Sequence, residues 1–311
     1  MSEQKTPVGI STGKKETPAF IILFGPDGTG KTTFGAEAPN SIFLEPEGGS
    51  NELDVARFDN VKSWNDVTKN VDRLLKEKLG FKSLVIDSLD QMEILLHRHI
   101  CSEQKKDTIE ECFGSYGKWV AGVQGYWAEF IDKLKLLRQQ EGMNIIVIGH
   151  SMIKAFNDPS QPAPYDRYTL KLNEKHAALW REQVDAVLFV NYETFVKTGK
   201  TGKAKAYGED VRKLYTQRRP QFDAKNRYGL PFEMPFEKGH MWSQFAAAKK
   251  AGQPDSAKAV NEELNALVAN ATGDIKTRIE AAITKAAGDL TTLIKIRNHA
   301  RTIIETNQED Q

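Results

Sequence analysis

Residues 25–32, GPDGTGKT, fit the phosphate-binding pattern G-x-x-x-x-G-K-[ST] at every fixed position. The apolar run Ala19 to Phe24 predicts a buried strand before this segment, and Lys31 to Ala38 lacks helix breakers and predicts a helix after it. A glycine-rich turn between a strand and a helix points backbone N–H groups at one place, which suits the phosphates of a nucleotide. The alternative is a turn that only connects the two elements, but the pattern and its context agree.

The segment therefore predicts an ATP site with bound Mg²⁺. Lys31 would reach the β- and γ-phosphates, and the Thr32 hydroxyl would join the Mg²⁺ shell. Asp87 ends a second buried strand, and Thr32 with Asp87 would supply the oxygen ligands that Mg²⁺ prefers. An acidic strand end facing solvent is the other interpretation of Asp87. The predicted nucleotide contacts are Gly25, Pro26, Asp27, Gly28, Thr29, Gly30, Lys31, Thr32 and Thr33.

Two acidic residues follow the predicted strand Ser41 to Leu44, in the sequence Glu45-Pro46-Glu47-Gly48-Gly49. ATP hydrolysis needs a carboxylate within hydrogen-bond reach of the attacking water. Glu47 is the preferred candidate because the two glycines after it would let the backbone approach the nucleotide. Glu45 remains the alternative.

His150 ends another apolar run, IVIGH, at residues 146–150. Ligands of open α/β sheets gather at the carboxyl ends of the strands, so His150 could contact the γ-phosphate or its water. A structural histidine is the other possibility. Lys225 and Arg227 flank Asn226, so on an extended segment both cations would point the same way. They are either solvated loop charges or groups that reach the γ-phosphate of a neighbouring subunit.

Strands and helices alternate through residue 150, which predicts an α/β fold with a mainly parallel sheet flanked by helices. Later strands around the lysine-rich segment 197–205 predict an antiparallel extension. Residues 152–173 show no periodicity and contain three prolines, which predicts a long loop. We expect a flexible arm at 1–18, an ATPase core at 19–245 and a small helical appendage with a frayed tail at 246–311.

The formal net charge is only +1, so any nucleic-acid binding must come from a local basic surface. Three segments combine cations with aromatic or polar residues, a composition that suits single strands because bases stack on rings and phosphates meet cations. The alternative is that the aromatic rings are core residues and the lysines only aid solubility. The candidates are Tyr116, Lys118 and Trp119, the loop 151–175, and the tip 197–205.

Only two cysteines occur, and no apolar run approaches the roughly 20 residues that span a bilayer. The polar N-terminus contains no hydrophobic segment. These features predict a cytoplasmic protein with no membrane association.

Taken in order, these motifs resemble the RecA-like P-loop ATPases of bacteriophages, in particular the small recombinases grouped with single-strand annealing proteins. The resemblance covers about residues 19–240. It implies that Glu47 is the catalytic glutamate, that His150 is the polar sensor residue before a DNA-binding loop, and that Lys225 and Arg227 act in trans. A first DNA-binding loop would fall near residues 105–118. The chain has no long N-terminal domain of the kind that packs recombinase filaments, and it ends in an additional helical segment.

The resemblance implies a homo-oligomeric ATPase, stimulated by single-stranded DNA, that promotes DNA annealing or recombination. One alternative is a ring-shaped helicase-like or packaging motor on the same core. Another is a loader or scaffold whose partner binding is switched by the nucleotide.

Overall fold

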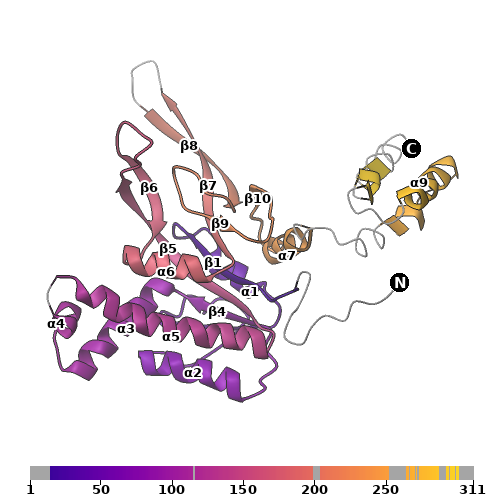
Figure 1. The fold of residues 1–311 in the computed structure, drawn as a ribbon. Helices are drawn as coiled ribbons and strands as arrows, with labels where there is room; N and C mark the ends of the chain where they lie inside the picture. Colours follow the sequence, from indigo (N-terminus) through magenta and orange to yellow (C-terminus); the bar gives the residue numbers. More distant parts are fainter. Residues whose placement is uncertain are drawn as a thin grey trace. The chain divides into compact units, whose positions relative to one another are not determined.

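The computed structural model describes residues 15–114, 116–198, 204–251 and parts of the segment 264–300. Those parts are residues 264–265, 267–269, 271, 273–286, 292–293, 295–297 and 299–300. Contacts divide the chain into two units, Met1–Lys250 and Ala251–Gln311 (Figure 1). Residues 1–14 of the predicted arm and residues 199–203 of the predicted tip lie outside the described residues.

A mixed β-sheet forms the centre of the first unit, with the strand order β10-β8-β7-β1-β5-β4-β2-β3. The six strands from β7 to β3 in this order are parallel, and β8 and β10 add an antiparallel edge. Two further strands pair off this path, β6 with β5 and β9 with β7. The strands are β1 (Phe20–Gly25), β2 (Ser41–Leu44), β3 (Ala56–Arg57), β4 (Ser83–Asp87), β5 (Asn144–Phe156), β6 (Tyr165–Leu170), β7 (Ala186–Thr198), β8 (Ala204–Tyr215), β9 (Lys225–Asn226) and β10 (Glu233–Pro235).

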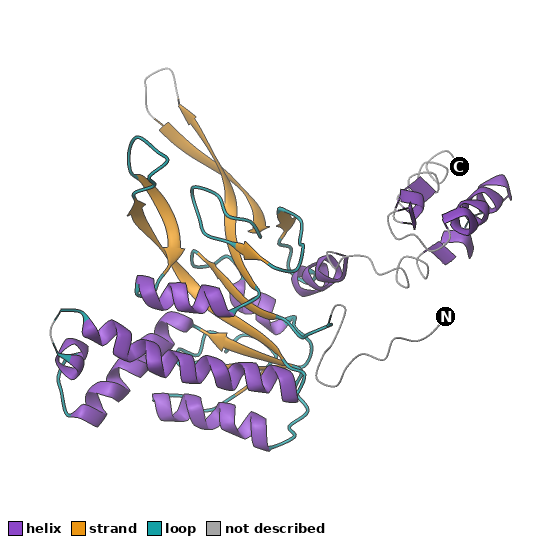
Figure 2. Cartoon of the chain, in the orientation of Figure 1, coloured by secondary structure: helices purple, strands orange, loops and turns teal. Residues whose placement is uncertain are grey.

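Helices cover both faces of this sheet (Figure 2). Alternate residues of β1 point to opposite faces, so its apolar run is buried on both sides. Helices α2, α3, α5 and α6 pack on one face, and α1 and α7 on the other. The helices of the first unit are α1 (Lys31–Ala36), α2 (Trp64–Lys76), α3 (Leu89–Gln104), α4 (Ile109–Phe113), α5 (Lys118–Gln140), α6 (Glu174–Gln183) and α7 (Met241–Ala251). The predicted α/β class with a mainly parallel sheet and an antiparallel extension is confirmed.

Two of the parallel strands continue past the carboxyl edge of the sheet and form hairpins (Figure 1). Strand β5 pairs with β1 as far as His150, and beyond it β5 pairs antiparallel with β6. Strand β7 pairs with β1 as far as Phe189, and from Phe189 to Thr198 it pairs antiparallel with β8. Because β5 and β7 lie on either side of β1, the phosphate loop that follows β1 lies between the bases of the two hairpins.

The prediction of a long loop at residues 152–173 is wrong. Residues 151–156 form the second half of β5, and only the segment 157–164 connects it to β6. The hairpin extends beyond the core, so its side chains are mostly exposed or half-buried and show no alternation of apolar and polar residues. Near its tip the rings of Phe156 and Tyr165 pair across the two strands, with centroids 5.7 Å apart.

The second unit contains helix α9 (Gly273–Ala286) and its own small apolar cluster. Buried members of this cluster include Leu264, Ile279 and Leu293. Helix α7 crosses the predicted boundary at residues 245/246, and the contacts place the division after Lys250. No helix in the described part of the chain is long and apolar enough to cross a membrane.

Candidate nucleotide-binding site

The phosphate loop follows β1 directly and leads into α1. Gly28 and Gly30 have φ angles of 73° and 92°, which residues other than glycine rarely adopt. A Cβ atom on Gly30 would lie 2.6 Å from Nη1 of Arg212. The glycines therefore allow both the left-handed turn and the close approach of a neighbouring arginine.

Lys31 is folded back over its own loop. Its ammonium group donates to the carbonyl oxygens of Gly25, at 3.0 Å, and Pro26, at 2.7 Å. The side chain is buried, and this burial lowers the pKa of the ammonium group. The two carbonyls hold the Lys31 ammonium group beside the loop, from where the side chain can move to contact a phosphate.

Thr32 and Asp87 meet at the carboxyl edge, although they are far apart in the sequence. The Thr32 hydroxyl donates to Oδ2 of Asp87 at 2.8 Å. Burial raises the pKa of Asp87, and the Thr32 hydrogen bond opposes that shift. A hydroxyl and a carboxylate in direct contact supply two oxygen donors of the kind that Mg²⁺ takes in nucleotide sites, so the residues present fit that ion.

His150 lies next to Gly25 in the register of β1 and β5. Its Nδ1 is 3.0 Å from both carboxylate oxygens of Asp90, and its backbone N–H donates to Asp90 at 3.2 Å. Its Nε2 faces Asp27 of the phosphate loop at 3.4 Å. The hydrogen bond with Asp90 raises the pKa of His150. Burial alone would raise the pKa of Asp90, but the hydrogen bonds from His150 and the charge of His150 lower it overall.

These groups surround a pocket of about 360 Å³. It is lined by phosphate-loop residues together with Asp87 and His150. The structure thus brings the predicted residues Lys31, Thr32, Asp87 and His150 together at one site.

The two candidate glutamates have different environments. Glu45 is buried, and its carboxylate accepts hydrogen bonds from the backbone N–H of Ser50, at 2.9 Å, and from the Ser50 hydroxyl, at 2.5 Å. Nε of Arg57 lies 3.6 Å from Oε1 of Glu45 and donates to the Ser50 hydroxyl at 3.1 Å. Glu47 is exposed, and no hydrogen bond or ion pair involves its carboxylate within the described part of the chain. Glu45 therefore closes the turn, and Glu47 is available to water.

Lys225 and Arg227 lie at the opposite edge of the sheet from the phosphate loop, because β9 pairs with the first residues of β7. The Lys225 ammonium donates to the carbonyls of Arg181, Glu182 and Val184 at the end of α6, at 2.6 to 3.1 Å. Arg227 is 57% exposed and lies 3.9 Å from Asp185. The two cations therefore have different environments: Lys225 is engaged within its own chain, and Arg227 is largely exposed.

The predicted nucleic-acid contacts are also separated by the fold. Tyr116 is fully exposed in the turn before α5, and Lys118 is exposed at the start of that helix. Trp119 is instead half-buried against the core, with its ring nearly perpendicular to those of His97 and His176. Segment 151–175 carries exposed Ile153 and Lys154 on its hairpin.

Three residues at the site were not predicted to act there. Asp90 holds His150 from the first turn of α3. The Tyr192 hydroxyl donates to the Gly28 carbonyl at 2.9 Å, and Arg212 donates to the Thr29 carbonyl at 3.2 Å. The short spacing from Asp87 could have pointed to Asp90, whereas no local pattern marks Tyr192 or Arg212.

Comparison with known proteins agrees with this geometry. Residues 17–228 match the family model of an AAA domain. A curated relative is the SPbeta prophage-derived uncharacterized protein YorG of Bacillus subtilis (strain 168), which is 25% identical over 138 residues. The alignment covers 42% of this chain and 40% of the relative, so the chain spans less than half of that protein's length.

Proposed function

Because this chain belongs to the AAA-domain family of P-loop ATPases, we propose that it hydrolyses ATP in response to single-stranded DNA and promotes DNA annealing or recombination. The relative is prophage-derived, which supports a phage origin and action in the cytoplasm of the host cell. RecA-like architecture and a homo-oligomer in which Arg227 acts in trans belong to the same proposal.

One observation carries this proposal: both strands beside the phosphate loop continue into the projecting hairpins. His150, which faces the loop, is followed within the same strand by the exposed half of β5. Tyr192 contacts the loop from β7, which continues to Thr198. A change at the phosphates would therefore be transmitted through His150 and Tyr192 to the backbones of β5 and β7, which continue into the two hairpins.

The surface beside the β5–β6 hairpin suits an anionic nucleic-acid strand. A pocket of about 520 Å³ opens there, lined by the cations Lys154 and Arg218 among others. Arg167 and Arg181 also reach this pocket, but both are paired with Asp223. Lys154 and Arg218 are exposed and form no ion pair within the described residues, so they are the groups available for phosphates.

Within the nucleotide pocket the roles follow from position. Lys31 would move from its two carbonyls to the phosphates, and Thr32 with Asp87 would hold Mg²⁺. Glu47 would orient the attacking water. His150 would report the presence of the γ-phosphate to the hairpin through its backbone, with Asp90 fixing the ring.

The proposal is tested by ATPase rates with and without single-stranded DNA, together with oligomer mass with and without nucleotide. We expect Lys31→Ala to abolish ATP hydrolysis and single-stranded DNA to stimulate the wild-type chain. Lys154→Glu should weaken DNA binding and flatten its salt dependence, whereas Lys78→Glu, an exposed lysine after α2, should leave both unchanged.

Other outcomes would redirect the assignment. A closed ring that translocates along DNA would favour the helicase-like or packaging motor. Absence of binding to any single strand at low salt would favour the nucleotide-switched loader. Wild-type ATPase rates in pure Lys31→Ala protein would contradict the site itself.

A further inference from the structure

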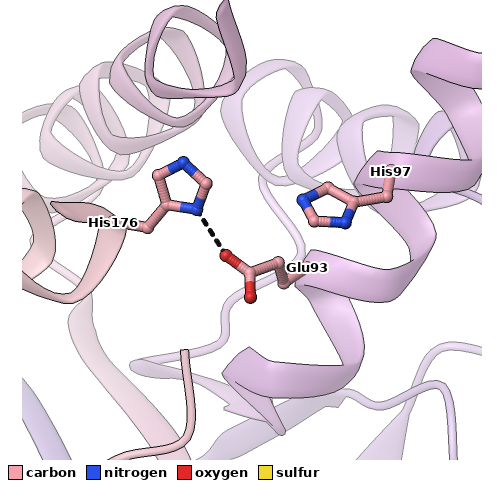
Figure 3. A group of neighbouring side chains, drawn as sticks. All are labelled: Glu93, His97 and His176. Atoms are coloured by element: carbon pink, nitrogen blue, oxygen red, sulfur yellow. Dashed lines mark hydrogen bonds and ion pairs between the residues drawn. The ribbon is translucent and has the colours of Figure 1, made fainter. Parts of the chain in front are cut away.

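A second cluster of ligand-type side chains lies away from the nucleotide pocket, between α3 and α6. Glu93 and His97 are one turn apart on α3, and His176 comes from α6 (Figure 3). One ligand atom from each of the three residues lies within 4.8 Å of the other two. No residue of this cluster contributes to the ATP site described above.

The hydrogen bonds of His176 define the character of the cluster. His176 is fully buried, its Nε2 is 3.1 Å from the carbonyl oxygen of Val120, and its Nδ1 is 2.5 Å from Oε1 of Glu93. A carbonyl can only accept, so Nε2 carries the proton in the neutral ring. Nδ1 then presents a lone pair to a carboxylate that is also an acceptor. Either an additional proton or a cation must lie between these two groups.

His97 supplies a third possible metal ligand, a ring nitrogen that is not engaged elsewhere in the described part of the chain. Its Nε2 is buried and has no hydrogen-bond partner among the described residues. The ring of Trp119 lies nearly perpendicular to both histidine rings, at centroid distances of 5.5 and 5.8 Å. Figure 3 shows a ring nitrogen of His97 facing the space beside Glu93 and His176.

We propose that Glu93, His97 and His176 bind a divalent transition-metal cation of the zinc class. Two imidazoles and one carboxylate form a donor set that zinc favours and that Mg²⁺ does not. The Val120 carbonyl would be the outer partner that fixes the tautomer and orientation of a ligating histidine.

Binding requires a small rearrangement. Two ligands at tetrahedral positions around zinc are about 3.4 Å apart, so Glu93 must move away from Nδ1 of His176. Within the described residues, the second carboxylate oxygen of Glu93 accepts only a 3.4 Å hydrogen bond from the backbone N–H of Asn173. Glu93 is also 14% exposed, so it has room to rotate. The proton between Glu93 and His176 would be released as the metal enters.

The metal would fasten three helices together. Glu93 follows Asp90 by one turn of α3, Val120 belongs to α5, and α6 begins four residues after the β5–β6 hairpin ends. The site would therefore brace the helix that holds His150 against the helix that follows the hairpin. Its primary effect would be on stability rather than on the phosphate contacts.

The test uses the full chain carrying Cys101→Ser and Cys112→Ser, because the two thiols lie 3.8 Å apart and could bind zinc themselves. After removal of metal with a chelator and without nucleotide, zinc is titrated against a competing chromophoric chelator. We expect one zinc per chain and a rise in melting temperature on zinc addition. Co²⁺ should give the visible absorption of a tetrahedral site.

Variants of two histidines on the same helix distinguish zinc binding at this cluster from zinc binding elsewhere on the chain. His97→Gln removes a nitrogen that makes no hydrogen bond, so it should fold normally and lose at least about 10-fold in zinc affinity. Glu93→Gln should do the same. His99→Gln is the matched control, because its Nε2 faces Glu103 instead of the cluster. Zinc affinity in folded His97→Gln equal to that of the control, or no stoichiometric zinc in the parent, would overturn the proposal.

Discussion

The carboxylate of Asp90 contacts both the backbone N–H and the ring of His150, with both oxygens 3.0 Å from Nδ1. This pair joins the first turn of α3 to the point where β5 leaves the sheet and enters its hairpin. The ring's other nitrogen faces Asp27 of the phosphate loop. His150 is thus fixed from behind by one carboxylate and directed at the loop on its other side.

Asp90→Asn should lower the pKa of His150 toward its ordinary value, because the charged hydrogen bond that raises it is lost. A raised histidine pKa stabilises the fold fully below about pH 6.5, and this contribution disappears as pH rises through the folded-state pKa. The lowered pKa of Asp90 stabilises the fold above about pH 4, and that contribution disappears as pH falls further.

The pair therefore contributes most between about pH 4 and 6.5. We expect Asp90→Asn to cost about 1 kcal/mol in that window, at the low end for a charged hydrogen bond because His150 is partly solvated. The cost should be smaller near pH 9. Histidine titration by NMR and urea unfolding at the two pH values check this. An unchanged His150 pKa in folded Asp90→Asn would contradict the interpretation.

Glu47→Gln and Glu45→Gln should fail in different ways. Glu45 accepts two hydrogen bonds from Ser50 while buried, so its substitution should lower the free energy of unfolding by about 1–3 kcal/mol. Glu47 is exposed, so Glu47→Gln should leave stability unchanged and reduce kcat by about 100-fold or more if it orients the attacking water. Paired denaturation and ATPase measurements separate the two. Normal turnover by Glu47→Gln would remove it from the catalytic site.

Arg212→Ala should weaken ATP turnover, although Arg212 lies on β8 and is far from the phosphate loop in the sequence. Its guanidinium donates to the Thr29 carbonyl and fills the space beside Gly30. We expect a loss of about 10-fold or more in kcat/KM, because the loop loses a positioning contact beside the phosphates. Lys213→Ala is the matched control: the next residue along β8 pairs with Glu193 and Glu233 instead. Equal losses in both variants would indicate a general effect on β8.

The sequence predicted those parts of the site that depend on short segments. The phosphate loop, the strand ending at Asp87 and the position of His150 each follow from a local apolar run and the residue after it. The sheet then brings these ends to one edge, as expected for parallel strands. The contact between Thr32 and Asp87 needed only that β4 and β1 share this edge.

What the sequence missed depends on strand pairing over long distances. The β5–β6 hairpin lies beyond the core, so burial imposed no apolar alternation on residues 151–156 and nothing distinguished them from a loop. Arg212 and Tyr192 reach the phosphate loop only because β7 and β8 pair in one particular register. In the turn containing Glu47 the prediction was only partly determined, since the sequence permitted either glutamate to point outward.

Lys225 and Arg227 were predicted to act as a pair in trans, but they have different environments in the structure. Lys225 donates three hydrogen bonds to carbonyls at the end of α6. Lys225→Ala should therefore reduce the stability of its own chain by about 1–3 kcal/mol, since those carbonyls lose a charged donor. Arg227→Ala should change stability little, because its contact with Asp185 is long and exposed.

Arg227 alone is thus the candidate for action on a neighbouring subunit. Its position at the far edge of the sheet keeps it from the phosphate loop of its own chain. Mixing Arg227→Ala with Glu47→Gln should restore part of the ATPase activity that each variant lacks, because mixed interfaces pair an intact arginine with an intact glutamate. Mass measurement must confirm that mixed assemblies form. If they form and activity stays absent, Arg227 does not complete a neighbour's site.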